Sequence, residues 1–433
     1  MIRTLLCLIV FAQPLAAMDI VEVISPEGTR VWVVDAPEIP IVSLELNFEG
    51  GSRLDPDGRE GLTTMMVGLL AEGAGEQDAL AFAEARQDLA ARFGFRNDKD
   101  SVSVSASVLS ETLDESVALL ASAIARPRFD PPAVDRVRTQ LLSAIDSDTR
   151  NPRALAGRAL SETFFAGHVY ARPSDGTRSS VSAITVDDLR LQHARTLVRG
   201  RVTAAVVGDI RPEEAGPLID RLLAGLPEAG PPLPEPADVQ EGGAPLIIPF
   251  DVPQSIAVFG HEGPARDDPA FLAAFVANTV IGGGGFGSRL AEDIREARGL
   301  TYSISTALSP RDQAALILGS VSSANDRIAE VVRLVEEEWT RAGQDGITAD
   351  ELDEAKRYLT GAYALRFTSN GAIAGSLVGL QRAGLPIDYP DRRNALVEAL
   401  TLEEVNAAAR ALYRPDALRF VIVGQPEGLT RTE

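Results

Sequence analysis

The stretch TAAVVGDI, residues 203–210, decides the fold because its pattern recurs as RFVIVGQP at residues 419–426. Each is a nearly continuous apolar run that closes on a glycine, which is typical of a buried strand. Each also follows a short predicted helix that begins with a threonine N-cap and carries acids in its first turn. The recurrence indicates that the chain contains an internal duplication.

Other segments repeat in the same order. Landmarks in the two halves lie 213 to 218 residues apart, as Ser107 and Ser320, or Val134 and Leu352, show. In each half a predicted strand is followed by two helices, at 101–108, 113–125 and 133–145 and again at 314–323, 326–342 and 351–365. Short strands joined by long amphipathic helices predict an α+β fold of two tandem homologous domains, each a largely antiparallel sheet with helices packed on one face.

The N-terminal residues predict a signal peptide. Residues 1–17 contain one positive charge at Arg3, a short apolar run and small residues before the expected cleavage after Ala17. The alternative is a buried N-terminal strand. The only cysteine, Cys7, falls inside this segment, so the mature chain has no cysteine. We therefore expect a periplasmic or otherwise secreted protein without disulfides.

Composition limits the domains and the partners. The segment 226–245 is rich in proline, glycine and acids, so we expect it to be a linker between domains at 18–225 and 246–433. The net charge is −21, which repels nucleic acid and anionic lipid. Beyond the signal peptide no run approaches 18 apolar residues, so we expect no direct membrane insertion.

Three motifs together resemble the insulinase/pitrilysin family of inverted zinc peptidases, which includes the mitochondrial processing peptidase. They are NFEGGSRLDPDGREGL at 47–62, FFAGHVYARPSDGTRSSVSAITVDDL at 164–189 and GGGGFGSRLAEDIREARGLTYSIS at 282–305. The last is the most specific of the three. The resemblance covers most of the mature chain and implies two homologous α+β domains, in agreement with the duplication.

The family's zinc motif is H-x-x-E-H, in which two histidines at i and i+4 on one helix face share a zinc ion. Aligned on GLTTMMVG, its histidines fall on Thr64 and Gly68 and its glutamate on Val67. The third ligand and its companion acid fall on Ala144 and Val137. We therefore expect no zinc site and no cofactor in this chain. His168, His193 and His261 are widely separated, which favours structural or surface roles.

The resemblance implies that Arg295 and Tyr302 bind substrate near the scissile bond, since a guanidinium and a phenol can donate to a developing oxyanion. Local pairing of Arg295 with Asp293 or Glu296 is the alternative. The loop Gly282, Gly283, Gly284 and Gly285 resembles the family's substrate-contacting loop, or is a plain connector; it lacks the ending of a phosphate loop. For Arg289 we expect local packing or pairing.

The leading hypothesis is a zinc-free subunit of an exported heterodimeric peptidase. Zinc would sit on a homologous partner that carries H-x-x-E-H, and the substrates would be unfolded peptides. The alternative is a non-enzymatic scaffold or peptide-binding protein, like the core subunits of respiratory complexes with this fold. A third reading, an enzyme active alone, would need metal ligands that the sequence does not show. Ser/His/Asp catalysis has no support because no G-x-S-x-G elbow occurs.

Overall fold

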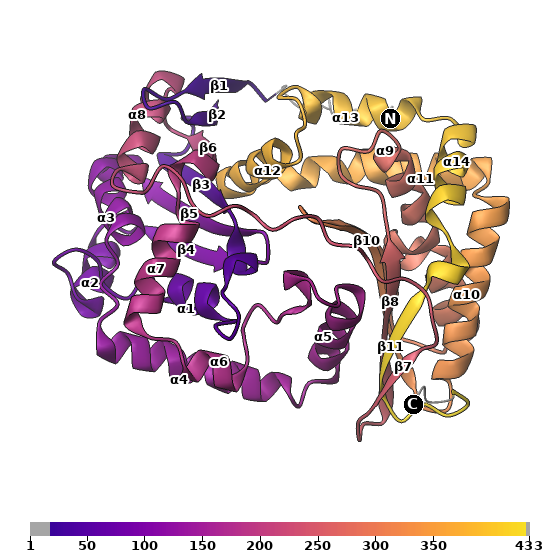
Figure 1. Ribbon diagram of the computed structural model, residues 1–433. Helices are drawn as coiled ribbons and strands as arrows, with labels where there is room; N and C mark the ends of the chain where they lie inside the picture. Colours follow the sequence, from indigo (N-terminus) through magenta and orange to yellow (C-terminus); the bar gives the residue numbers. More distant parts are fainter. Residues whose placement is uncertain (1–17, 430–433) are drawn as a thin grey trace, which may run out of the picture.

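The computed structural model describes residues 18–429, so the predicted signal peptide lies outside the described residues. Two α+β domains stand side by side, the N-terminal one in indigo to magenta and the C-terminal one in salmon to yellow (Figure 1). Each contains one sheet, and the sheets have the strand orders β1-β2-β6-β3-β5-β4 and β7-β11-β8-β10-β9. The predicted fold class is confirmed.

The two sheets share their topology. In the first, β6 pairs in parallel with β2 and antiparallel with β3, and β5 pairs antiparallel with β3 and β4. In the second, β11 takes the place of β6 and pairs with β7 and β8 in the same senses. The first sheet consists of β1 Ile20–Ile24, β2 Arg30–Asp35, β3 Ile41–Glu49, β4 Arg92–Asn97, β5 Ser101–Leu109 and β6 Val202–Gly208. The second consists of β7 Leu246–Pro249, β8 Gln254–Glu262, β9 Ile304–Pro310, β10 Ala315–Ala324 and β11 Arg419–Gly424.

The glycines that close the two repeated strands explain why the pattern recurs. Gly208 has φ 135° and Gly424 has φ 154°, values that side chains rarely adopt. A Cβ at Gly208 would lie 2.0 Å from the Ile41 carbonyl oxygen, and one at Gly424 would lie 2.3 Å from Ser255 Oγ. Both glycines therefore allow close approach to the neighbouring strand at the same point of each sheet.

The helices follow the same duplicated order, with α3 and α4 of the first domain matched by α10 and α11 of the second. Thr185 and Thr401 form the predicted capping boxes before α7 and α14. The first domain contains α1 Leu62–Leu69, α2 Ala79–Asp88, α3 Leu113–Ala125, α4 Pro131–Asp148, α5 Pro152–Phe164, α6 Arg178–Ser182, α7 Val186–Thr196 and α8 Pro212–Leu223. The second contains α9 Phe271–Asn278, α10 Ile328–Asp345, α11 Ala349–Tyr363, α12 Asn370–Arg382, α13 Tyr389–Ala399 and α14 Leu402–Leu412.

Each domain sends one helix to the sheet of the other. Helix α5 packs against β8 and β11 of the second sheet, and α12 packs against β3 and β6 of the first (Figure 1). The apolar cluster under α12 joins Ala374, Leu377 and Val378 to Trp32 and Val207. Strands such as β6 therefore bury both faces, one under their own helices and one under the exchanged helix, which explains their continuous apolar run.

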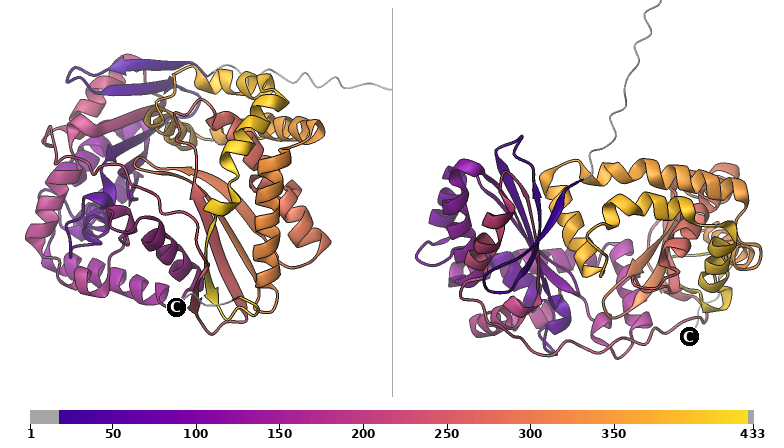
Figure 2. Two further views of the ribbon diagram at one scale, coloured as in Figure 1. Left: turned by 45° about the vertical axis from the view of Figure 1, so that its right-hand side comes forward. Right: turned by 90° about the horizontal axis from the view of Figure 1, so that it is seen from above.

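The connection between the domains is extended and hydrogen-bonded to both. Residues 229–245 contain no helix or strand. The backbone N–H of Gln240 donates to the Phe164 carbonyl oxygen at 2.9 Å, and that of Ala237 donates to Gln313 at 2.8 Å. The two additional views show this segment running along the outside of the paired domains (Figure 2). Within residues 18–429 no helix has the length and apolar character needed to cross a membrane.

Candidate functional site

Helix α1 carries the positions at which the family would place its zinc ligands, and its N-terminus is anchored without a metal. The buried Asp55 carboxylate accepts hydrogen bonds from the backbone N–H groups of Gly61 and Thr63, both at 3.0 Å. The Thr63 hydroxyl donates to the same carboxylate at 2.5 Å. Gly61 enters the helix at φ 90°, where a Cβ would lie 2.6 Å from the Asp175 carbonyl oxygen. These contacts explain the motif at 47–62 by its role in the fold, without a metal.

The positions that correspond to zinc ligands lie on α1 and on the adjacent α4. The Thr64 hydroxyl donates to the Ser174 carbonyl oxygen at 2.8 Å and accepts from Asn97 Nδ2 at 3.0 Å. A Cβ at Gly68 would lie 3.2 Å from Val137 Cγ1, so these two positions face each other. Val67 and Val137 are buried in the apolar core, whereas Ala144 is exposed on α4.

These five residues do not fit a zinc ion. Protein ligands for zinc are thiolate, imidazole and carboxylate groups. Thr64 has the only side-chain polar atom among the five, and that hydroxyl already makes two hydrogen bonds. Elsewhere in residues 18–429, no group of three or more His, Cys, Asp or Glu side chains gathers closely enough to hold a metal ion. The five positions on α1 and α4 therefore lack the side chains that the family's zinc chemistry needs.

The partners of Thr64 line a cleft of about 980 Å³ between the two domains. Its wall is polar and carries both signs of charge, from Lys99 and Asp175 of the first domain and Arg311 and Asp312 of the second. Burial and the nearby Arg311 lower the pKa of Lys99 to about 8. The Lys99 ammonium donates to the Arg172 carbonyl oxygen. The cleft suits a polar, extended ligand better than an apolar one.

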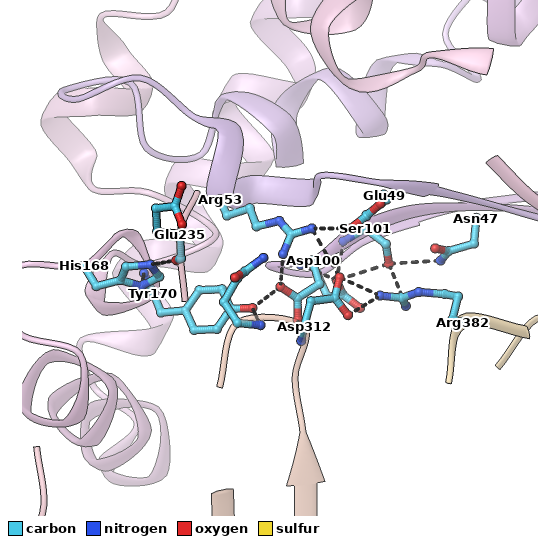
Figure 3. Close-up of polar contacts among 12 residues, drawn as sticks. Asn47, Glu49, Arg53, Asp100, Ser101, His168, Tyr170, Glu235, Asp312 and Arg382 are labelled. Carbon is cyan, nitrogen blue, oxygen red and sulfur yellow. Dashed lines mark hydrogen bonds and ion pairs between the residues drawn. The ribbon is translucent and has the colours of Figure 1, made fainter. Parts of the chain in front are cut away.

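An ionic network that joins the domains includes Asp100, Asp312 and Arg382, which line the cleft (Figure 3). The buried Arg53 guanidinium pairs with Asp100 and with Asp312, each at 3.2 Å. Asp312 also pairs with Arg382 at 3.1 Å. The Tyr170 hydroxyl donates to Asp100 and accepts the backbone N–H of Gln313 at 3.0 Å. Burial raises the pKa of Asp100, and Asp312 raises it further, although the bond from Tyr170 acts in the opposite direction.

Sequence reasoning did not single out this network. Arg53 and Asp312 are 259 positions apart, and neither belongs to a spacing with a known chemistry. Only two features of the sequence pointed indirectly to these residues. Tyr170 lies in the quoted mid-domain motif, and the serines of the alternating strand β5 mark a polar face, where Ser101 Oγ accepts from Arg382 at 3.3 Å. A polar face on a half-buried strand could have indicated the cleft.

The two predicted substrate-binding residues lie in the second domain, where Arg295 is half-buried and Tyr302 is exposed. Arg295 belongs to the π-helix Ala291–Ala297 and pairs with Glu296 at 3.0 Å, as in the local alternative. Gly299, at φ 62°, follows shortly after the end of this helix. Tyr302 precedes the edge strand β9, and 83% of its surface is exposed. An exposed tyrosine beside an unpaired sheet edge is available to another molecule.

The four-glycine loop is explained mainly by packing within the domain. A Cβ at Gly282 would lie 2.4 Å from Thr306 Oγ1, one at Gly283 would lie 2.7 Å from Asn278 Nδ2, and one at Gly284 would lie 2.6 Å from the Thr279 carbonyl oxygen. Gly285 differs, because it has φ 66° and open space around a built Cβ. Of the four, Gly285 is the position at which another chain could approach.

The histidines and Arg289 have structural partners, as predicted. His261 Nε2 accepts from Trp339 Nε1 at 2.9 Å, His193 Nε2 lies 2.6 Å from the Ile124 carbonyl oxygen, and His168 Nδ1 accepts the Tyr170 N–H at 3.2 Å. Arg289 pairs bidentately with Glu351, at 2.6 and 2.7 Å. These side chains therefore hold the fold together and do not form part of the cleft.

Comparison with known proteins supports the resemblance. The insulinase family, peptidase family M16, matches residues 30–178, and the domain described as "Peptidase M16 inactive domain" matches residues 183–359. A "Non-peptidase homolog YmxG" from Helicobacter pylori is 26% identical over 386 residues, which are 89% of each chain. The crystal structure of a peptidase M16 inactive domain from Pseudomonas fluorescens has a TM-score of 0.89 at 29% identity, covering 96% of this chain and 100% of that one.

A chain of complex III2 from Candida albicans shares the fold, with a TM-score of 0.77 at 17% identity over 94% of this chain and 96% of that chain. The chain is a two-domain protein with the fold of these peptidases, in which α1 and α4 are present but carry no zinc ligands. The two matches together span residues 30 to 359 apart from a short gap, and the chain belongs to peptidase family M16.

Proposed function

We propose that this protein is the zinc-free subunit of an exported heterodimeric zinc peptidase. A homologous partner with H-x-x-E-H would hold the zinc, and this chain would contribute Arg295 and Tyr302 to the shared substrate site. The substrates would be unfolded peptides bound in extended form along a sheet edge. The observation that carries the proposal is that the M16 frame is kept while all five zinc-site positions lack ligand side chains.

Two further features support it. Tyr302 is a large, exposed side chain next to the edge strand β9, where it can donate a hydrogen bond to a bound peptide. The match of residues 183–359 to the inactive domain of the family agrees with a supporting role in hydrolysis. The proposed export rests on the signal-peptide pattern of residues 1–17.

The test is recovery of the native assembly. The tagged mature chain is isolated from the periplasm of its own cells, its companions are identified by mass spectrometry, and cleavage of unfolded peptides is measured with and without a chelator. We expect a roughly equimolar partner bearing H-x-x-E-H, and chelator-sensitive cleavage that exceeds that of the partner alone. Recovery with membrane-complex proteins and no such cleavage would support the scaffold function instead.

A further inference from the structure

A second cavity, of about 730 Å³, lies in the C-terminal domain between α9, α12, α13 and the turn Ala364–Phe367. Its size is in the range of small-ligand and side-chain pockets. Five aromatic rings line its wall, those of Phe271, Phe275, Tyr363, Phe367 and Tyr389. The pocket is separate from Arg295, Tyr302 and the glycine loop, none of which lines it.

Three arginines share this aromatic wall. The Arg266 guanidinium lies 4.4 Å from the centroid of the Phe271 ring, and that of Arg393 lies 4.6 Å from the Tyr363 ring. Arg366 is the third arginine of the lining and is exposed. Such cation–π contacts orient a guanidinium but leave its charge uncompensated.

Within the part of the chain that the structure describes, these three arginines form no ion pair. Among residues 18–429, no carboxylate lies within 4.0 Å of Arg266, Arg366 or Arg393. Arg393 is only 7% exposed and donates to two neutral oxygens, the Leu359 carbonyl at 2.7 Å and Asn394 Oδ1 at 3.1 Å. In a protein of net charge −21, a buried cation without an anion is unfavourable unless a ligand supplies one.

Two glycines of α12 leave open space at the wall of the pocket. Gly375 and Gly379 of α12 line it, and a Cβ at either position would meet no atom within 4 Å. A glycine inside a helix lowers helix stability by about 1 kcal/mol relative to alanine. Keeping this space open therefore destabilises α12. The pocket lies next to the interdomain cleft, because Arg266 and Gly379 line both spaces.

We propose that this pocket binds the carboxyl-terminal end of an unfolded peptide. The last apolar or aromatic side chain would pack among the rings, and the terminal carboxylate would pair with the arginines, which bind carboxylates through two parallel N–H donors. The preceding residues would extend past Gly379 into the polar cleft. For its ligand class this inference rests on the proposed function, but it assigns a different site and needs no partner subunit.

The experiment measures peptide binding to the isolated mature chain by fluorescence anisotropy. Two short fluorescein-labelled peptides end in Leu-Phe and differ only in a free carboxylate or an amide at the C-terminus. We expect the free acid to bind about tenfold more tightly than the amide. Arg366→Gln should remove most of that difference, and Gly375→Leu, which fills the pocket, should weaken both peptides. The matched control is Arg357→Gln, an exposed arginine of α11 that does not line the pocket.

Several results would overturn the inference. Equal affinity for the acid and the amide would show that the arginines do not bind the terminal carboxylate. Equal effects of Arg366→Gln and Arg357→Gln on binding would show the same. Binding of dodecanoate without binding of either peptide would identify a lipid-like ligand. Because the assay contains no partner subunit, a negative result here leaves the partner-dependent cleavage assay unaffected, and the two proposals fail separately.

Discussion

Arg53 and Asp312 form a 3.2 Å ion pair that joins the two domains. The Arg53 side chain is fully buried beside the first sheet, whereas Asp312 lies on the turn between β9 and β10. Asp312 also pairs with Arg382 at the end of the exchanged helix α12. One carboxylate therefore neutralises two cations, and removing it leaves a buried guanidinium short of an anion.

We predict that Asp312→Ala lowers the free energy of unfolding by about 2–3 kcal/mol, because Arg53 stays buried with one partner fewer. Denaturant unfolding of the mature chain measures the change. The control is Asp326→Ala, which removes a surface pair with Arg327 at 3.8 Å and should cost about 0.5 kcal/mol or less. A loss for Asp312→Ala no larger than for the control would show that the network does not stabilise the fold.

His261 gives a prediction of pH dependence. Its Nε2 accepts from Trp339 Nε1 and its Nδ1 lies 2.7 Å from the Glu262 carbonyl oxygen, so the neutral ring with a proton on Nδ1 satisfies both contacts. Burial and, to a smaller extent, Arg414 lower the pKa of His261 to about 4, although the bond to Glu262 acts in the opposite direction. A second proton, on Nε2, would point at the Trp339 indole N–H, which is itself a donor.

Because the folded-state pKa of His261 lies below the unfolded value of about 6.5, its contribution to stability is complete above pH 6.5 and is lost as the pH falls to about 4. We expect a loss of about 3 kcal/mol over this window from this group. His261→Gln, which is less stable at neutral pH but does not titrate, should show a correspondingly flatter pH profile in thermal unfolding. Parallel profiles for the two proteins would contradict the assignment.

Sequence patterns predicted the parts of the fold that depend on local periodicity. The strict alternation of residues 101–108 became β5, whose valines face the core and whose serines lie on the opposite face. The repeated buried runs became the equivalent strands β6 and β11. The exchange of α5 and α12 was not predictable in this way, because an amphipathic pattern shows that a helix has an apolar face but not which sheet that face covers.

In the candidate site, too, local sequence patterns predicted some features, whereas contacts between distant residues were not predictable. Motif spacing placed Thr64 and Gly68 on one helix and Val137 on a second, and the structure brings Gly68 and Val137 into contact distance. The interdomain network and the aromatic pocket are formed by residues that lie far apart in the sequence and meet only in the folded chain. Arg266 and Arg393, for example, lie on different elements and share no motif, so only their common place in the pocket relates them.

The degenerate zinc site gives a prediction of metal content. We expect the wild-type chain, dialysed against zinc and analysed by mass spectrometry, to retain far less than one equivalent, because the five positions offer no ligand side chain. The variant Thr64→His/Gly68→His/Val137→Ala/Ala144→Glu should approach one equivalent, with Val137→Ala making room for the new side chain at position 68. Stoichiometric zinc in the wild type would instead mean that other residues bind it.

The last prediction concerns Tyr302 and Arg295 in the reconstituted assembly. Tyr302 is 83% exposed, so Tyr302→Phe should change the free energy of unfolding by about 0.5 kcal/mol or less. If its hydroxyl donates to the developing oxyanion, the same variant should lower kcat about 100-fold with little change in KM, because that donor acts mainly in the transition state. Arg295→Ala should reduce kcat/KM in the same assay.

Arg298→Ala is the matched control for both variants, since Arg298 follows the same π-helix and pairs with Asp293 at 3.1 Å on the surface. Its kcat and KM should equal those of the wild type. The comparison separates a catalytic role from a general electrostatic one, because Arg295→Ala removes one positive charge from the π-helix and Arg298→Ala removes one from its C-cap. Equal kcat and KM values in Tyr302→Phe, Arg295→Ala and Arg298→Ala would mean that this surface does not contact the reacting peptide.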